Sequence, residues 1–197
     1  MKKMALRIDR KCALIVVDVQ NDFCPGGALA VKRGGRVVPV FNQYLRRFEK
    51  AGAPVYACRD WHPWDHCSFR KQGGPWPPHC VQDTRGARFH PDLLLPADAR
   101  VISKGWRRED DSYSEFEATC LELELKRSGV RRIFVGGLAT DYCVKRTVLD
   151  GRRLGFVTHL LTDAIQGIDV RKGDSGKAVR QMKKAGAVPV TLKDFPV

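Results

Sequence analysis

Four side chains that commonly bind metal ions lie close together near the middle of this chain. They are Asp60, His62, His66 and His79. Asp60 and His62 are two residues apart at the end of an expected strand, so both side chains leave the same face and can reach one ion. Pro77 and Pro78 stiffen the approach to His79, which reduces the conformational entropy lost when its imidazole binds a metal. This spacing predicts a metal site built from one carboxylate and three imidazoles.

Three residues elsewhere in the chain are candidates for covalent chemistry. Asp18 ends the first expected strand, Lys104 directly follows the third, and Cys143 lies in the segment GLATDYC at the turn into a helix. Ligands of parallel α/β sheets bind at the carboxyl ends of the strands, where these residues and the metal ligands would meet. Together they indicate a metal-assisted cysteine hydrolase. A position at a helix N-terminus favours the thiolate form of Cys143.

Taken singly, several of these residues have a simpler explanation. Asp18 in DVQNDF could be a turn former, Lys104 a surface lysine, and Cys143 a buried structural thiol. Cys67 and Cys80 adjoin two of the histidines, so a structural zinc site of mixed cysteine and histidine ligands is a further alternative. That alternative leaves Asp18, Lys104 and the GLATDYC turn unexplained.

Short β-branched runs alternate with amphipathic stretches along the chain, which predicts a βαβα order. Strands are expected at 12–19, 54–59, 99–103, 131–136 and 155–161, with a weaker one near 187–191. Helices are expected from Val37 to Phe48, ended by Gly52, and over 115–128, 141–154 and 174–185. The pattern predicts a three-layer αβα sandwich with a mostly parallel central sheet. Residues 60–97 are expected to form a long irregular segment, which is usually functional in a compact domain.

Composition limits the class of protein. The chain has 197 residues, of which 43% are hydrophobic, so one domain covering 1–197 is expected. It has seven cysteines, an odd number, and no Cys-x-x-Cys spacing, and Arg7, Asp9, Arg10 and Lys11 interrupt the first apolar run. These features predict free thiols in the cytoplasm and no signal peptide. No stretch approaches the roughly 20 apolar residues of a membrane span, so a soluble protein without a membrane partner is expected.

The formal net charge of +13 raises the question of a nucleic-acid partner. The basic residues are dispersed in pairs, such as Arg46 and Arg47, with no long run and no interleaved aromatic residues. A solvated surface explains this pattern better, and no nucleic-acid partner is expected. A basic nucleic-acid-binding module held together by zinc remains the alternative from another functional class.

Several segments together resemble a known family. They are DVQNDF (18–23), RDWHPWDHCSF (59–69), WPPHCVQDT (76–84), SKG (103–105), DSYSEF (111–116) and GLATDYCVKRTVLD (137–150). Their order and flanking residues closely resemble the nicotinamidases of the isochorismatase-like hydrolase superfamily, over about residues 12 to 190. Phosphate-binding glycine loops, a serine-centred elbow and an HExxH motif are missing.

The resemblance implies conversion of nicotinamide to nicotinate and ammonia through a cysteine thioester. It implies a catalytic triad of Asp18, Lys104 and Cys143, and an oxyanion hole from the backbone amides of Ala139 and Cys143 with a cis peptide between Leu138 and Ala139. The metal ligands would be the four residues introduced above. The residues contacting the substrate would be Phe23, Trp76, Tyr113 and Leu138.

The resemblance also implies one divalent metal ion that orients the pyridine ring. Zinc is the first expectation, and iron, manganese or cobalt also suit such ligands. Nicotinamide is the expected small-molecule partner, and the protein could be a monomer or a homo-oligomer. The alternative within the superfamily is a metal-independent amidase acting on a ureido or carbamoyl compound.

Overall fold

A single sheet of six parallel strands forms the centre of the computed structural model, which describes residues 6–196. The strands are β1 (Cys12–Val17), β2 (Val55–Asp60), β3 (Arg100–Lys104), β4 (Arg132–Leu138), β5 (Val157–Gln166) and β6 (Val188–Val190). Their order across the sheet is β3-β2-β1-β4-β5-β6, and every neighbouring pair is parallel. Strands are therefore added on one side of β1 up to β3 and on its other side from β4 onward. The carboxyl ends of β1 and β4 form the topological switch point, where α/β sheets bind ligands.

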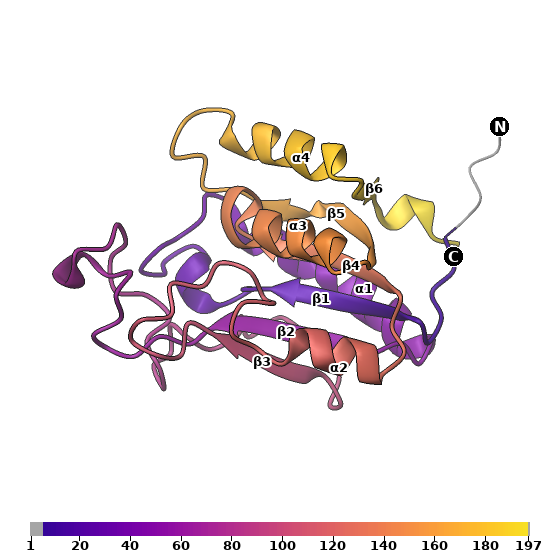
Figure 1. The fold of residues 1–197 in the computed structure, drawn as a ribbon, viewed down its shortest axis with the longest axis horizontal. Coiled ribbons are helices and arrows are strands. Elements are labelled where there is room, and N and C mark those ends of the chain that lie inside the picture. Colours follow the sequence, from indigo (N-terminus) through magenta and orange to yellow (C-terminus); the bar gives the residue numbers. More distant parts are fainter. Residues whose placement is uncertain (1–5, 197) are drawn as a thin grey trace.

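Helices cover both faces of the sheet (Figure 1). They are α1 (Val37–Lys50), α2 (Leu121–Arg127), α3 (Lys145–Arg153) and α4 (Asp174–Lys184). Leu14 and Val16 of β1 belong to the core that includes α1, whereas Ile15 belongs to the core that includes α2, α3 and α4. Because successive strand residues point to opposite faces, the fully buried run of β1 serves both cores. The predicted three-layer αβα sandwich is confirmed.

Four short 3₁₀ turns and one π-helical turn complete the regular structure of the described residues. The 3₁₀ turns are Asn21–Phe23, Gly34–Arg36, Arg70–Gln72 and Leu192–Asp194, and the π turn is Thr140–Val144. None of the helices between residues 6 and 196 is long and apolar enough to cross a membrane.

The helix predicted over 115–128 is shorter in the structure, where α2 begins only at Leu121. Ala118 has a φ of 53°, in the left-handed region, which interrupts a right-handed helix. The side chain of Glu117 instead accepts hydrogen bonds from the backbone N–H groups of Tyr113 and Ser114, at 2.8 and 3.0 Å. The residues before α2 therefore form a turn that carries Ser114 and Glu115 into the interior.

The segment after β2, residues 61–97, contains one 3₁₀ turn and is otherwise irregular, and backbone hydrogen bonds order it. The N–H of His62 donates to the carbonyl of Cys80 at 3.0 Å, and the N–H of Gln82 donates to the carbonyl of His62 at 2.8 Å. This short parallel pairing brings the segment that contains His79 alongside His62. The pairing explains how two histidines far apart in the sequence reach one site.

His159 in β5 is a buried histidine that lies outside this segment. Its ring stacks on Phe134 with ring centroids 4.3 Å apart, and its Nδ1 atom has no hydrogen-bond partner. Burial, followed by the positive charge of Arg132, lowers the pKa of His159 from 6.5 to about 4. The unfolded chain therefore binds more protons than the folded protein between these two pH values. Stability is lost as the pH falls through this window, by about 3 kcal/mol in total.

Replacing His159 by leucine should remove this part of the acid sensitivity, because leucine does not titrate. Denaturant unfolding at about pH 7 and about pH 4.5 measures the difference in free energy of unfolding, which should shrink in His159→Leu by about 2 kcal/mol. The control is His90→Leu, a change at a partly exposed histidine that should keep the full difference. An unchanged difference in His159→Leu would show that His159 does not cause the acid sensitivity.

Candidate active site

Four charged or nucleophilic residues meet at the carboxyl edge of the sheet. Asp18 directly follows β1, Asp60 ends β2, Lys104 ends β3, and Cys143 lies in the π turn that follows β4. All four are buried. One carboxylate oxygen of Asp18, one of Asp60 and the Cys143 sulfur lie within 4.8 Å of one another. The structure thus brings the predicted nucleophile next to a predicted metal ligand.

The Lys104 ammonium group joins these residues. Its Nζ atom donates to Asp18 Oδ2 at 2.7 Å and to Asp60 Oδ1 at 2.6 Å. A third carboxyl group, that of Glu115, lies 3.1 Å from the same nitrogen. Lys104 and Glu115 are completely buried, and no role for Glu115 was expected from the sequence.

Burial and charge pairing act against each other on these groups. Burial, partly offset by the charge of Lys104, raises the pKa of Asp18 to about 6. Burial also favours the neutral form of Asp60, but Lys104 and His62 outweigh it and hold the pKa of Asp60 below its usual range. Burial alone would lower the pKa of Lys104, yet the Asp18 and Asp60 carboxylates raise it well above its usual value. Lys104 is therefore a permanent positive charge beneath the site.

A helix N-terminus was predicted to favour the thiolate of Cys143, but the burial and charges around the sulfur act against that form. Burial, reinforced by the Asp18 and Asp60 carboxylates, raises the pKa of Cys143 well above its usual value, and Lys104 only partly opposes this. The helix expected over 141–154 also begins differently, because the N–H of Val144 bonds to the carbonyl of Ala139 at 3.2 Å, five residues back. Such π turns are frequent at functional sites. The thiol therefore needs a base, and Asp18, which has a carboxylate oxygen within 4.8 Å of the sulfur, is the candidate.

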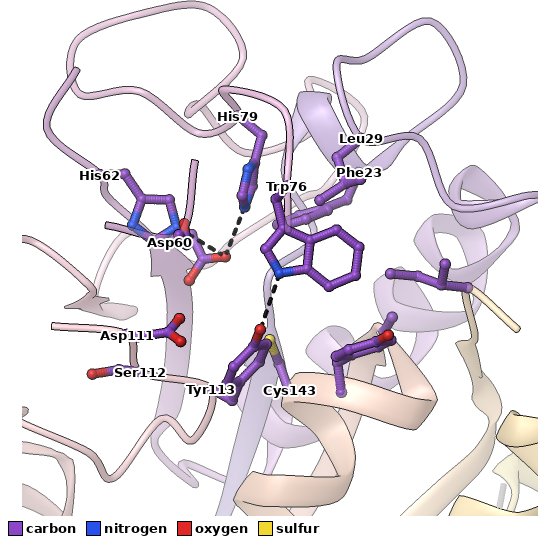
Figure 2. Close-up of a pocket in the computed structure, with 14 residues that line it drawn as sticks. Phe23, Leu29, Asp60, His62, Trp76, His79, Asp111, Ser112, Tyr113 and Cys143 are labelled. Carbon is purple, nitrogen blue, oxygen red and sulfur yellow. Dashed lines mark hydrogen bonds and ion pairs between the residues drawn. The ribbon is translucent and has the colours of Figure 1, made fainter. Parts of the chain in front are cut away.

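Three of the four predicted metal ligands form a compact group. Donor atoms of Asp60, His62 and His79 lie within 4.8 Å of one another, and all three residues are buried. The Nε2 atoms of His62 and His79 lie 3.5 and 3.9 Å from Asp60 Oδ2 (Figure 2). Their Nδ1 atoms lie 2.8 Å from the carbonyl oxygens of Gly105 and Pro77. These contacts fix the tautomer that leaves each Nε2 free for a cation, so the group fits a divalent metal ion.

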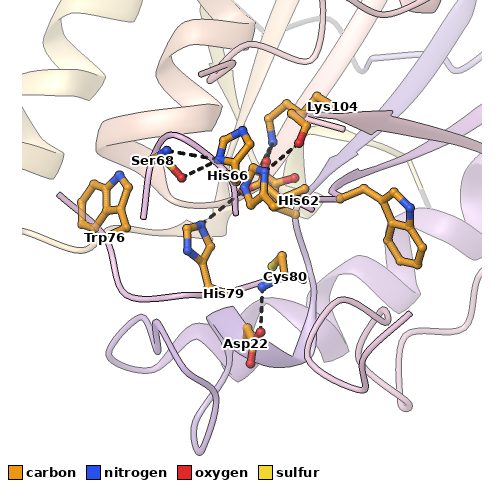
Figure 3. Close-up of polar contacts among 12 residues, drawn as sticks. Asp22, His62, His66, Ser68, Trp76, His79, Cys80 and Lys104 are labelled. Atoms are coloured by element: carbon orange, nitrogen blue, oxygen red, sulfur yellow. Dashed lines mark hydrogen bonds and ion pairs between the residues drawn. The ribbon is translucent and has the colours of Figure 1, made fainter. Parts of the chain in front are cut away.

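His66 is placed beside this group rather than in it. Its ring stacks on that of His62 with centroids 4.0 Å apart. Its Nδ1 atom contacts Ser68 Oγ at 2.7 Å (Figure 3). Its Nε2 atom contacts the Asp110 carbonyl at 3.1 Å, so both nitrogens have partners. A role for His66 as the fourth ligand stays a prediction.

Gly105 shows why the SKG segment ends in glycine. It has a φ of +58°, and a Cβ atom there would lie 2.5 Å from Cε1 of His62. A side chain at this position would push the His62 ring out of place. Glycine therefore lets the loop after β3 support the metal-ligand group.

Gln20 and Asp22 position the site in ways that the sequence did not indicate. The side chain of Gln20 accepts from the N–H of Asp60 at 2.9 Å and donates to the carbonyls of Asp60 and Ala87 at 2.8 and 2.9 Å. Asp22 Oδ2 accepts from the N–H of Cys80 at 2.8 Å (Figure 3). The loop after β1 thus holds the backbone on both sides of the metal-ligand group.

The predicted cis peptide between Leu138 and Ala139 is present. Ala139 lines the pocket together with Cys143. Leu138, by contrast, is completely buried in the core on the α1 side and is not among the residues that line the pocket. A direct substrate contact by Leu138 is therefore not supported, because its side chain faces the core.

Aromatic side chains form the walls of the pocket above Cys143 (Figure 2). Phe23, Trp76 and Tyr113 line it as predicted, and the Trp76 indole N–H donates to the Tyr113 hydroxyl at 3.0 Å. Tyr142 also lines it, with its ring centroid 5.1 Å from that of Trp76. Further lining residues that the sequence did not indicate are Leu29, Ser68, Asp111, Ser112 and Ile168. The pocket suits a small flat ring.

The alternative of a structural zinc site with cysteine ligands finds no support. Among residues 6–196, the groups of three or more potential ligands include neither Cys67 nor Cys80. Cys80 is instead packed in the core on the α1 side.

Comparison with known proteins identifies the family. The model of the isochorismatase domain matches residues 12–194. The chain belongs to the isochorismatase family. It is similar to the nicotinamidase of Escherichia coli K12 over most of its length. The two chains are 41% identical over 93% of this chain and 96% of the relative.

Two solved structures share the fold of this isochorismatase-family protein. A pyrazinamidase of Pyrococcus horikoshii in complex with zinc is 47% identical, with a TM-score of 0.89 over 92% of this chain and 99% of the other. The PnC1 protein of L. infantum in complex with nicotinate is 36% identical, with a TM-score of 0.90 over 98% and 99% of the two chains.

Proposed function

We propose that this protein is an amidohydrolase that converts nicotinamide to nicotinate and ammonia through a thioester on Cys143. One observation carries the proposal: the Cys143 thiol and the group formed by Asp60, His62 and His79 line the same aromatic pocket. The similarity to the Escherichia coli nicotinamidase and to a structure with nicotinate supports this substrate.

The walls of the pocket fit the two ends of nicotinamide. In the view of Figure 2, His62 lies to the left of the Trp76 indole and His79 lies above it, whereas Cys143 lies below it. A pyridine ring held against Trp76 would direct its carboxamide toward Cys143 and its ring nitrogen toward the imidazoles. Flat aromatic walls favour such a ring.

Acylation begins with proton transfer from the Cys143 thiol to the Asp18 carboxylate. The sulfur then attacks the amide carbon, and the backbone N–H groups of Ala139 and Cys143 stabilise the oxyanion that forms. Asp18 returns the proton to the departing nitrogen, so ammonia leaves and the nicotinoyl thioester remains. The Lys104 ammonium stabilises negative charge on both the sulfur and Asp18.

Deacylation uses the same residues in reverse. Asp18 takes a proton from water, whose oxygen attacks the thioester carbon. The carbon–sulfur bond then breaks, the Cys143 sulfur takes the proton from Asp18, and the new carboxyl group loses its proton to solvent. Nicotinate is released, and Asp18 and Cys143 return to their initial states.

Asp60, His62 and His79 would hold a divalent metal ion, which would supply a Lewis acid that orients and polarises the pyridine ring. Zinc is the proposed metal, supported by the zinc complex of the Pyrococcus horikoshii pyrazinamidase. We propose a cytoplasmic role in NAD salvage, which is consistent with seven free cysteines.

The metal separates this proposal from a metal-independent amidase acting on a ureido or carbamoyl compound. We expect the rate of ammonia release from nicotinamide to be about 10- to 100-fold lower in His62→Ala than in the wild type, and to fall similarly when the wild type is treated with a chelator. Metal content measured by mass spectrometry should fall in parallel. His90→Ala, outside the pocket, serves as the control. Turnover that survives chelation and His62→Ala would favour the metal-independent alternative.

A further inference from the structure

Glu115 is a completely buried acidic residue that no step of the proposed reaction uses. It lies in the turn before α2, and its backbone N–H donates to the Thr147 hydroxyl of α3 at 3.1 Å. Thr147 is also completely buried and lies one turn after Cys143. Glu115 is therefore fixed between the end of β3 and the helix that follows the nucleophile.

The carboxyl group of Glu115 faces the Lys104 ammonium. Its Oε1 atom lies 3.1 Å from Nζ, and neither carboxyl oxygen has a well-formed hydrogen bond. An ammonium group has three N–H donors, and Lys104 directs two of them to Asp18 and Asp60. Glu115 supplies the third oxygen around this nitrogen.

Charge balance indicates the state of this carboxyl group. Three ionised carboxylates around one buried ammonium would leave excess negative charge away from water, which is costly. Asp60 shares its charge with the metal site, because its Oδ2 atom faces His62 and His79. Glu115 lies next to the neutral Cys58 thiol rather than a second positive charge, and burial, reinforced by the charge of Asp18, raises its pKa well above the usual value. If Glu115 is protonated, only the Asp18 and Asp60 carboxylates carry negative charge beside the Lys104 ammonium.

We propose that Glu115 is a positioning residue, a neutral carboxyl group that holds the Lys104 ammonium between Asp18 and Asp60 and so keeps Asp18 directed at the Cys143 thiol. Glu115 is not among the residues that line the pocket, so it acts through Lys104 rather than on the substrate. The measurement of nicotinamide turnover in the test below rests on the proposed function.

Two substitutions of similar size separate this role from simple packing. Glu115→Leu removes the polar group, and we expect kcat for nicotinamide to fall about 10- to 100-fold with a much smaller change in KM. Glu115→Gln keeps a neutral carbonyl oxygen and an N–H donor in place of the O–H, and should recover most of the lost kcat. Glu122→Gln, on the surface of α2, controls for removal of an acidic residue.

A second measurement does not depend on turnover. The rate of Cys143 alkylation by iodoacetamide in the metal-loaded protein, followed by mass spectrometry of the peptide that contains it, should fall about 10-fold in Glu115→Leu and recover in Glu115→Gln. Should the wild type fail to release ammonia from nicotinamide, the proposed function fails, while the alkylation rates still test Glu115.

The outcomes are distinct. Equal losses in Glu115→Gln and Glu115→Leu would overturn the proposal, because they would show that an ionised carboxylate is needed. Wild-type kcat and alkylation rates in Glu115→Leu would overturn it as well, because they would show that the residue only fills space. If Glu115→Leu does not fold, alkylation and kcat of Glu115→Gln near the wild-type values support the neutral state, and their loss refutes it.

Discussion

Replacing Cys143 by alanine is expected to reduce nicotinamide turnover by at least about 10⁴-fold, because no other group can form the thioester. Cys143 is the one cysteine among the residues that line the pocket. The sulfur is a small part of a buried site, so the free energy of unfolding should change by only about 1 kcal/mol. Ammonia release and denaturant unfolding measure the two quantities.

The covalent route has its own signature. Wild-type enzyme quenched with acid during turnover should carry a nicotinoyl group on the peptide that contains Cys143, and Cys143→Ala should carry none. Cys120→Ala, at an exposed free cysteine, is the matched control and should keep full activity. Residual turnover of Cys143→Ala near the wild-type rate would exclude the thioester.

Lys104→Met should reduce both stability and activity. The substitution keeps a long side chain but removes the ammonium, so Asp18 and Asp60 lose donors at 2.7 and 2.6 Å in a site without solvent access. Breaking one side of a buried ion pair typically costs about 3 to 5 kcal/mol in the free energy of unfolding. Loss of the charge that stabilises the thiolate should lower kcat by about 10²- to 10³-fold.

A double-mutant cycle tests the cause of this destabilisation. Asp18→Asn removes a carboxylate that Lys104→Met leaves unpaired, so the double variant should be more stable than the sum of the single changes predicts. Its activity should not recover. Lys126→Met removes a lysine from an exposed pair with Glu122 and should cost at most about 1 kcal/mol. Additive effects in the cycle would contradict direct pairing of Asp18 with Lys104.

Much of the fold followed from local patterns in the sequence. The apolar run at 12–17 is buried on both faces, and the three- and four-residue spacing of Phe41, Tyr44, Leu45 and Phe48 places one helix face in the core. The helix start near residue 115 was wrong, because the left-handed backbone at Ala118 has no clear signal in the sequence. The π turn at 140–144 likewise depends on a bond to Ala139 that helical periodicity does not reveal.

The site residues that lie at the ends of strands could be predicted from the sequence. Asp18, Asp60 and Lys104 each end a strand or directly follow one, so sheet topology alone brings them together. Glu115 and Gln20 could not be found in this way, since neither lies at a strand end and their roles depend on tertiary contacts. Glu115 contacts Lys104 and Thr147, and Gln20 contacts the backbone of Asp60 and Ala87. The resting protonation of Cys143 could not be predicted either, because it depends on burial and on neighbouring groups such as Lys104 and Asp18.

The carboxylate of Asp60 serves two centres at once. Its Oδ1 atom binds the Lys104 ammonium at 2.6 Å, and its Oδ2 atom faces His62 and His79. A cation drawn to one oxygen withdraws electron density from the other, and so weakens the hold of Asp60 on Lys104. Cation occupancy and nucleophile reactivity are then thermodynamically linked. By reciprocity, modification of the sulfur should change the affinity for the ion by the same factor as the ion changes the equilibrium of the modification.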